Sequence, residues 1–357
     1  MENGLNKLKT FANKKDVRIS LKRYGIEAMS AMAQGLFASL LIGTILNTIG
    51  TQFHIELLNQ VGSFAMSTAG VAMAVAIGYA LKAPPLVLFS LATVGTAANS
   101  LGGAGGPLAV LVIAILSAEI GKLVSKETKV DIIVTPAVTI VFGVALSILI
   151  APRIGAVASS IGTAIMWATE LHPFLMGIIV SVLVGIALTL PISSAAICAA
   201  LSLTGLAGGA AVAGCCSHMV AFAVASFKEN KIGGLISQGI GTSMLQMGNI
   251  VKNVKIAIPA IIASAITGPI ATCVFKMQMN GPAISSGMGT CGMVGPIGVY
   301  SGWVSDIANG SKIAITANDW IGLVLICIVI PAIVGWIFNL VLREIGWIKD
   351  GDMKLDL

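Results

Sequence analysis

The sequence has little charge and few aromatic residues. Of 357 residues, 10% are charged and 5% are aromatic, whereas 56% are hydrophobic, and the mean hydropathy is +0.96. Soluble globular domains carry about 25% charged residues. Apolar runs near the roughly 20 residues needed to cross a hydrocarbon core recur along the whole chain. No stretch between these runs is long enough to form a large soluble domain. The composition therefore predicts an all-α polytopic membrane protein.

Cysteine pairs and catalytic motifs are also missing. The six cysteines include no C-x-x-C pair, so neither a zinc site nor a disulfide framework is indicated. No H-E-x-x-H motif or P-loop appears, and no Ser-His-Asp or paired-carboxylate constellation is recognisable. We therefore expect no catalytic residues, no metal and no cofactor. Whether this chain takes part in an enzymatic reaction stays open.

One stretch, GMGTCGMVGPIG at 287–298, contains a formal G-x-G-x-x-G. A dinucleotide site also needs a preceding strand, a following helix and an acidic residue about 20 residues further on. Asp306 lies only 14 residues beyond Gly292, and the flanking segments resemble neither a strand nor a helix. In a membrane chain, unwound backbone is tolerated where it is buried in protein or lines a wet cavity. We predict a re-entrant glycine-rich loop facing a polar solute.

The basic residues are concentrated at the N-terminal end. Seven of the 21 precede the first hydrophobic segment, which is a positive-inside signal with anionic lipid headgroups, not nucleic acid, as the partner. The predicted organisation is a basic amphipathic cytoplasmic segment at 1–24, one transmembrane domain at 25–343 and a short cytoplasmic tail at 344–357. Both termini are then cytoplasmic, the loop 51–60 is external, and the location is the bacterial cell membrane.

The lysines and arginines suggest about ten transmembrane segments. Two short helical hairpins are included, each broken at glycines: one has arms at 84–99 and 107–121 around SLGGAGG, and the other has arms at 195–206 and 210–227 around TGLAGGA. The segment 154–170 either spans the membrane or lies along its interface. Residues 232–250 are too polar and glycine-broken to span alone. The long spans are predicted at 25–50, 61–81, 130–151, 172–190, 254–275 and 317–342.

An internal repeat is indicated by two halves, 61–151 and 172–275. Each contains a span, a glycine-rich hairpin and a proline-containing span, with similar sequences around Pro136 and Pro259. Repeats with broken helices are how many transporters build a solute site near the bilayer midplane. For any single glycine, close helix packing is an alternative explanation.

Uncharged polar residues next to these breaks are the candidate solute-binding residues. Amides and hydroxyls suit a neutral sugar or polyol, whose hydroxyls both donate and accept hydrogen bonds, although each hydroxyl could equally satisfy a helix end. Glu170 and His172 could bind a sugar or form an external helix cap, whereas His218 is a lone histidine. The candidates are Asn99, Ser193, Ser194, Gln246, Asn249, Ser285, Ser286, Gly289, Thr290, Glu170 and His172, with Thr242 and Ser243 in the same polar run.

Five long strings carry a family resemblance: NSLGGAGGPLAVL (99–111), HPFLMGIIVS (172–181), LPISSAA (190–196), GTSMLQMGNIVKN (241–253) and GMGTCGMVGPIG. Through them the chain resembles the IIC-like membrane subunits of the bacterial phosphoenolpyruvate-dependent sugar phosphotransferase system. Within that family it is most similar to the stand-alone branch that includes the perfringolysin O regulator.

The resemblance implies a usually dimeric protein that imports a sugar by an elevator-like movement while a phosphorylated IIB domain phosphorylates it. This chain contains no IIB or IIA domain, so a phosphoryl donor would have to be a separate IIB protein. We predict a sugar-transport subunit, acting as a homodimer. A membrane sensor or regulator built on a transporter fold is the alternative, and an ion-coupled carrier or channel is the second.

Overall fold

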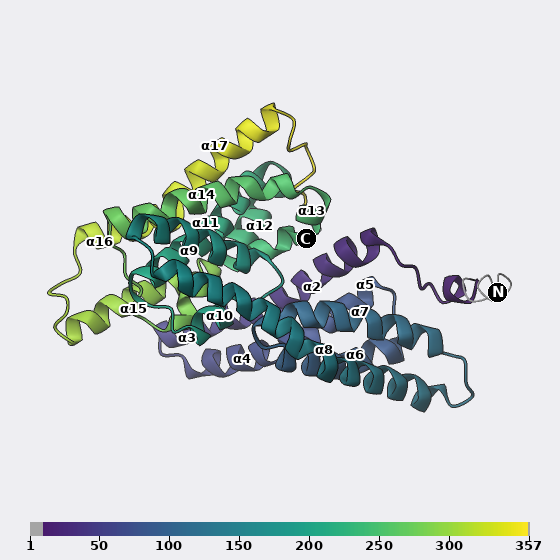
Figure 1. The fold of residues 1–357 in the computed structure, drawn as a ribbon. Helices are drawn as coiled ribbons and strands as arrows, with labels where there is room; N and C mark the ends of the chain where they lie inside the picture. Colours follow the sequence, from purple (N-terminus) through teal and green to yellow (C-terminus); the bar gives the residue numbers. More distant parts are fainter. Residues whose placement is uncertain (1–9, 356–357) are drawn as a thin grey trace. The chain divides into compact units, whose positions relative to one another are not determined.

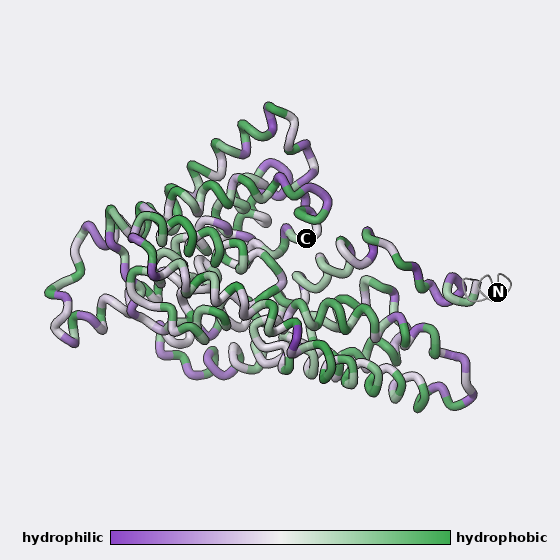
Figure 2. Tube along the Cα trace, in the orientation of Figure 1, coloured by the Kyte–Doolittle hydropathy of each residue, from purple (hydrophilic) through white to green (hydrophobic). Residues whose placement is uncertain are grey.

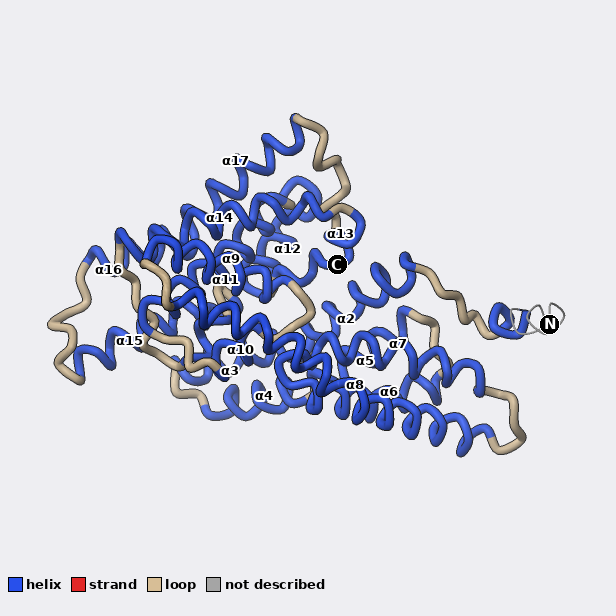
Figure 3. The backbone as a smooth tube through the Cα atoms, in the orientation of Figure 1, coloured by secondary structure: helices blue, strands red, loops and turns tan. Residues whose placement is uncertain are grey.

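The computed structural model describes residues 10–355, which form helices, turns and loops and contain no strand (Figure 3). An isolated antiparallel bridge pairs Gly205 with Met279. The α-helices are α2 (Ala28–Leu36), α3 (Ile42–Gln52), α4 (Glu56–Ser67), α5 (Ala69–Ala80), α6 (Pro85–Gly102), α7 (Gly106–Val124), α8 (Asp131–Thr169), α9 (Pro173–Thr189), α10 (Ser194–Ala200), α11 (Gly205–Ala225), α12 (Phe227–Ile236), α13 (Met247–Lys252), α14 (Ile258–Pro269), α15 (Val294–Ala308), α16 (Ala317–Val324) and α17 (Ile330–Glu344). Shorter 3₁₀ and π-helical segments are η1 (Lys22–Glu27), η2 (Phe37–Leu41), η3 (Gly103–Gly105), η4 (Ser237–Gly241), η5 (Ser243–Gln246), η6 (Val254–Ala257), η7 (Ile270–Val274), η8 (Ala283–Gly287), η9 (Cys291–Met293) and η10 (Leu325–Val329).

The helices belong to two compact units. Unit 1 consists of residues up to Leu40 together with Ser67–Gly155, and unit 2 consists of Leu41–Met66 and residues from Ala156 onward. These units cut across the predicted repeat halves 61–151 and 172–275, and the repeat itself stays a prediction.

Unit 1 contains the first predicted hairpin, with α6 and α7 packed on each other and on α5. A Cβ on Gly70 would lie 2.5 Å from the Gly95 carbonyl oxygen, so these glycines let α5 and α6 approach to backbone contact. The helix breaks at η3, where Gly103 has φ +50°. The arms are longer than predicted, at 18 and 19 residues. They reach about 27 and 28 Å, close to the thickness of a bilayer core.

Helix α8 corrects the predicted boundary between a span at 130–151 and a separate segment at 154–170. It is one helix of 39 residues, about 58 Å long, with Pro136 and Pro152 inside it. Proline removes a hydrogen bond and usually ends or kinks a helix, but the apolar residues on both sides continue the helix here. Between residues 155 and 156 it passes from unit 1 into unit 2.

Unit 2 is built around α11, which packs against α9, α14 and α17 (Figure 1). Small residues make these contacts possible, as in other membrane helix pairs. A Cβ on Gly214 would lie 1.9 Å from the Ser181 carbonyl oxygen, and one on Gly268 would lie 2.0 Å from the Gly177 carbonyl oxygen. As a result most of α11 is buried, including its polar Ser217 and His218.

The second hairpin differs from its predicted form. Its first arm, α10, has only seven residues, and the chain turns at Ser202 (φ +49°) and Gly205 (φ +63°). Of the glycines of TGLAGGA, which were predicted to form the turn, only Gly205 does so; Gly208 and Gly209 lie in the first turns of α11, which has 21 residues. Gly209 explains their presence in a helix, because a Cβ there would lie 1.9 Å from the Met277 carbonyl oxygen.

The third glycine cluster forms a buried irregular segment through η8 and η9. Gly289, Gly292 and Met293 have φ values of +54°, +51° and +59°. The flank VYSGWVSD, predicted to be non-helical, instead belongs to α15. Whether this loop is re-entrant in the membrane stays a prediction.

The structure confirms an all-α polytopic membrane protein. Within residues 10–355, six helical stretches are long and apolar enough to cross a membrane, or seven if α4 and α5, bent by 50° at Thr68, form one span. The apolar helix α9, with 17 residues, is slightly shorter. Figure 2 shows hydrophobic helices with hydrophilic residues gathered at connecting loops such as that between α15 and α16. The predicted count of about ten segments is not confirmed.

Candidate functional site

The second and third helix breaks meet in unit 2. Ser194, in the first turn of α10, donates a 2.7 Å hydrogen bond to the Gly287 carbonyl oxygen, and Ser286 donates a 2.6 Å hydrogen bond to the Leu203 carbonyl oxygen. Ser193 caps α10 by accepting the Ala196 N–H at 3.2 Å. The sequence predicted that these breaks share a region, but it could not show that these hydroxyls are bonded within the chain.

The same loop rests on α11. A Cβ on Gly289 would lie 2.7 Å from backbone and side-chain atoms of Cys215, so glycine is needed both for its positive φ and for this approach. Thr290 donates a 3.5 Å hydrogen bond to the Met219 sulfur. Ser285, in η8, is buried. The loop 283–293 therefore contacts α11 at Cys215 and Met219, which lie within one turn of His218 along the helix.

His218 is the centre of a buried polar chain. Its Nδ1 lies 2.9 Å from the Thr189 hydroxyl, and that hydroxyl lies 2.8 Å from the Ser243 hydroxyl. His218 Nε2 is buried and has no hydrogen-bond partner among the described residues. A Cβ on Gly185 would lie 3.0 Å from this nitrogen and 2.5 Å from the ring carbon Cδ2. Glycine at this position thus lets the imidazole pack directly against the backbone of α9.

Sequence reasoning undervalued this histidine and missed Thr189. His218 is surrounded by small apolar residues in the sequence, and Thr189 ends a different helix. Only the packing of α9 on α11 brings the two together. A usable signal was present, because an ionisable side chain deep in an apolar segment is costly and is functional by default.

The predicted amides Gln246 and Asn249 are bonded to the C-terminal tail. Gln246 Nε2 donates to the Met353 carbonyl oxygen at 3.0 Å and to the Gln238 side chain at 2.9 Å. Asn249 Nδ2 donates to the Lys354 carbonyl oxygen at 2.8 Å and to Gln246 Oε1 at 2.9 Å. Both side chains are buried. Their assignment to a solute stays a prediction, in competition with this structural role.

Ion pairs and apolar packing hold the tail in place. Asp350 accepts hydrogen bonds from Lys228 at 2.7 Å and from Arg343 at 3.0 Å, and Arg343 also pairs with Glu229 at 2.6 Å. The Lys228 ammonium holds the pKa of Asp350 below its ordinary value. Met353 is fully buried in a cluster with α11 and α14 residues. The tail at 345–355 is thus an integral part of unit 2.

None of the other three candidates belongs to the His218 hydrogen-bond chain. Asn99 belongs to unit 1, where a Cβ on Gly106 would lie 2.6 Å from its Oδ1. Glu170 and His172 are exposed in the short connection between α8 and α9. His172 occupies the N-cap position of α9 but makes no side-chain cap hydrogen bond. Because Glu170 and His172 lie in the connection between two helices, their position favours a role at a helix end over sugar binding.

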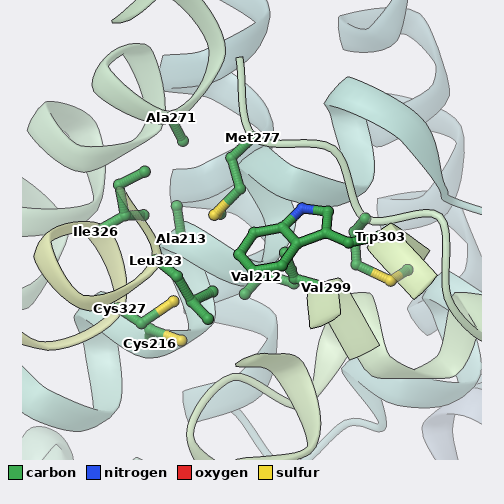
Figure 4. Close-up of a cluster of buried hydrophobic side chains, with 11 residues drawn as sticks. Val212, Ala213, Cys216, Ala271, Met277, Val299, Trp303, Leu323, Ile326 and Cys327 are labelled. Carbon is green, nitrogen blue, oxygen red and sulfur yellow. The ribbon is translucent and has the colours of Figure 1, made fainter. Parts of the chain in front are cut away.

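An open cavity of about 190 Å³ lies elsewhere in unit 2. Its apolar wall includes Trp303, Met277 and Leu323, which belong to one buried cluster (Figure 4). Its polar lining includes Asp306 and Gln278. None of these residues was predicted from the sequence to bind a solute; they come from the loop after η7, from α15 and from α16.

The polar groups of this cavity are held in place by hydrogen bonds. Asn280 Nδ2 donates to Asp306 Oδ2 at 2.8 Å and to Gln278 Oε1 at 3.1 Å. Lys312 pairs with Asp319 at 2.9 Å and lies 5.9 Å from the centre of the Trp303 ring. An indole wall beside amide and carboxylate groups is a surface that suits a polyhydroxylated solute. No group of metal-ligating side chains occurs among the described residues.

Comparison with known proteins agrees with this chemistry. The family model described as "Phosphotransferase system, EIIC" matches residues 26–355, which is nearly the whole chain. The search of curated proteins returned no match. The search of solved structures also returned none. The match does not distinguish the regulator branch, but it covers both units and every candidate residue. The chain therefore belongs to the EIIC family, the sugar-transporting membrane subunits of the phosphotransferase system.

Proposed function

We propose that this chain binds a neutral sugar in unit 2 and moves it across the membrane, with a separate IIB protein as the phosphoryl donor. The observation that carries the binding site is the unpartnered, buried Nε2 of His218, on the same helix, α11, that the glycine-broken loop 283–293 contacts at Cys215 and Met219. A buried polar atom without a partner costs about 1–3 kcal/mol. A sugar hydroxyl that bonds this nitrogen would remove that cost, and its entry would require α9 and α11 to separate at Gly185, where the ring now packs against the backbone.

The chemistry of the His218 chain favours a sugar over an ion. Thr189 and Ser243 add two hydroxyls that can each donate or accept. Neither bears a charge, and a neutral imidazole has one donor and one acceptor nitrogen. Such a set matches the alternating donors and acceptors of a polyol, whereas a coupling ion would require charged or carbonyl oxygen ligands.

The cavity beside Trp303 supports the same class of solute. Its indole wall could stack on the apolar face of a sugar ring, while Asp306 and Gln278 bond hydroxyls. We assign it to an initial, weaker encounter with the solute, distinct from the buried site at His218.

The IIB partner and a homodimeric state follow from the family membership and are proposed on that ground. Among the described residues no helix or loop forms a separate soluble module that could carry a phosphoryl group.

The proposal is tested by thermal shift of the detergent-purified protein against a panel of neutral hexoses, pentoses and hexitols. A ligand present at 100 times its Kd stabilises a protein by about 2.7 kcal/mol. The sugar that stabilises best is then assayed for uptake in proteoliposomes with and without the IIB protein. We expect uptake coupled to phosphorylation; binding without either would contradict the transport role.

The site assignment is tested with His218→Leu against Ser217→Ala. Ser217 is a buried polar neighbour on α11 that bonds Thr267 at 2.6 Å, away from the His218 chain. Both variants should melt lower without sugar, because each breaks a buried hydrogen bond. Only His218→Leu should also weaken sugar affinity, by about 10-fold or more. Equal affinity in the two variants would place the sugar elsewhere.

A further inference from the structure

A second cavity, of about 440 Å³, lies within unit 1 and is lined mainly by lysines. Five lysines line it: Lys14, Lys15, Lys82, Lys122 and Lys126. Two acidic residues, Asp16 and Glu127, also line it. Five positive and two negative charges leave a net charge of +3 around one opening.

The two acidic groups are already paired. Arg23, outside the lining, donates to Asp16 at 2.7 Å and holds the pKa of that carboxyl below its ordinary value. Lys15 forms an ion pair with Glu127. Lys122, 2% exposed, donates to the Asp16 carbonyl oxygen at 2.7 Å and to the Leu81 carbonyl oxygen at 3.1 Å. These bonds fix the wall of the cavity.

The remaining three cations face the opening without an anion. The side-chain ammonium groups of Lys14, Lys82 and Lys126 have no ion-pair partner in the part of the chain that the structure describes, and all three residues are exposed. Three unpaired like charges around one cavity repel each other. An anion in the cavity would remove that repulsion.

The backbone places two of these lysines in an uncommon conformation. Lys82 has φ +56° and Lys126 has φ +61°, in turns after α5 and α7. Outside glycine, asparagine and aspartate, such left-handed residues are rare and cost about 1–3 kcal/mol each. Lys231 and Lys276, outside this cavity, adopt the same conformation, so the case for a ligand rests on the charges around the cavity.

A helix N-terminus adds to the positive potential. Pro84, the N-cap residue of α6, also lines the cavity. The N-terminal end of this 18-residue helix carries a partial positive charge. The C-terminal end of α7 carries the opposite, partial negative charge. Lys15 offsets it by donating a hydrogen bond to the Ser125 carbonyl oxygen at 2.5 Å.

We infer that this cavity binds a phosphate group, presented either by an anionic phospholipid headgroup or as free phosphate. Ammonium groups recognise phosphate oxygens as charge-assisted donors. The cavity lies where the apolar helix α6 begins and the apolar helix α7 ends. The ends of membrane-spanning helices lie at the depth of the lipid headgroups. This site is independent of the proposed sugar transport, since it uses no residue of the His218 chain or of the Trp303 cavity.

The test uses a triple variant, Lys14→Gln, Lys82→Gln and Lys126→Gln, of the full chain. The matched control is Lys129→Gln, Lys231→Gln and Lys349→Gln, which removes the same charge from exposed positions that line neither cavity. In one arm the proteins are reconstituted with phosphatidylcholine containing phosphatidylglycerol, and retained lipid is measured by native mass spectrometry. In the other arm the melting temperature is measured against inorganic phosphate in detergent.

We expect the cavity variant to bind phosphatidylglycerol about 100-fold more weakly than the control, which is about 3 kcal/mol, or about 1 for each lysine. A loss confined to the phosphate arm would instead identify a free phosphate as the ligand. A triple Lys→Arg variant at the same positions should retain binding, which separates charge from misfolding. Indistinguishable behaviour of the cavity and control variants in both arms would overturn the inference.

Discussion

Replacement of Asn249 by leucine decides whether the amide cluster of unit 2 serves the solute or the fold. Asn249 is 6% exposed. Its Nδ2 donates to Gln246 Oε1 and to the Lys354 carbonyl oxygen, and its Oδ1 accepts from Lys252 at 3.3 Å. Leucine has nearly the same volume but no polar atom. The variant therefore leaves two acceptors without this donor while keeping the packing almost unchanged.

The expected cost follows from these two bonds. A buried acceptor left without a partner costs about 1–3 kcal/mol, and relaxation of the tail toward water lowers the sum, so we expect a loss near 2 kcal/mol. For a folding unit of this size, that lowers Tm by about 4–8 °C. Sugar affinity of the folded protein should change less than twofold, because the amide already bonds the chain.

The assay measures apo Tm and sugar affinity on one detergent preparation. Asn309→Leu is the control, because Asn309 is an exposed amide whose side chain makes one long hydrogen bond, at 3.4 Å to Ser305. It should change Tm by less than about 1 °C, since exposed substitutions cost within about 0.5 kcal/mol. An unchanged apo Tm together with a 5-fold or larger loss of affinity would refute the structural role and restore Asn249 to the sugar site.

Three further predictions concern other positions. Gly185→Ala should lower Tm and sugar affinity together, because the new methyl group would lie 2.5 Å from the His218 ring; a variant with wild-type values would show that the ring is free to move. Trp303→Leu should weaken sugar binding and reduce any sugar-dependent change in tryptophan fluorescence, and a full response in that variant would remove the solute from its cavity. Asp350 has a lowered folded-state pKa because of Lys228, so its stabilising effect is present above the unfolded value of about 3.9 and is lost as pH falls through the lower folded value. Wild type should therefore melt above Asp350→Asn at pH 7, and the gap should close as the pH falls through the lowered folded-state pKa, whereas a gap that does not change with pH would contradict the ion-pair role.

The sequence alone determined that this protein lies in a membrane, and it determined the fold class and the family. These properties are carried by composition and by long local strings: few charges, apolar runs near bilayer length, and glycine clusters that break helices. Helix breaks at 103–105 and across 283–293 were predictable because glycine with positive φ acts locally.

Tertiary structure decided which breaks meet and which polar groups are free. Continuity of α8 through Pro152, the short α10 and the helix at 299–306 depend on packing partners that local propensity does not include. Ser194, Gln246 and Asn249 looked available in the sequence but bond carbonyl groups about 93 to 107 residues away. His218 looked isolated but gained a buried hydrogen-bond chain when α9 packed on α11. A polar side chain in a membrane must find a partner somewhere in the fold, and the identity of that partner is a property of the folded chain, since residues distant in sequence supply it.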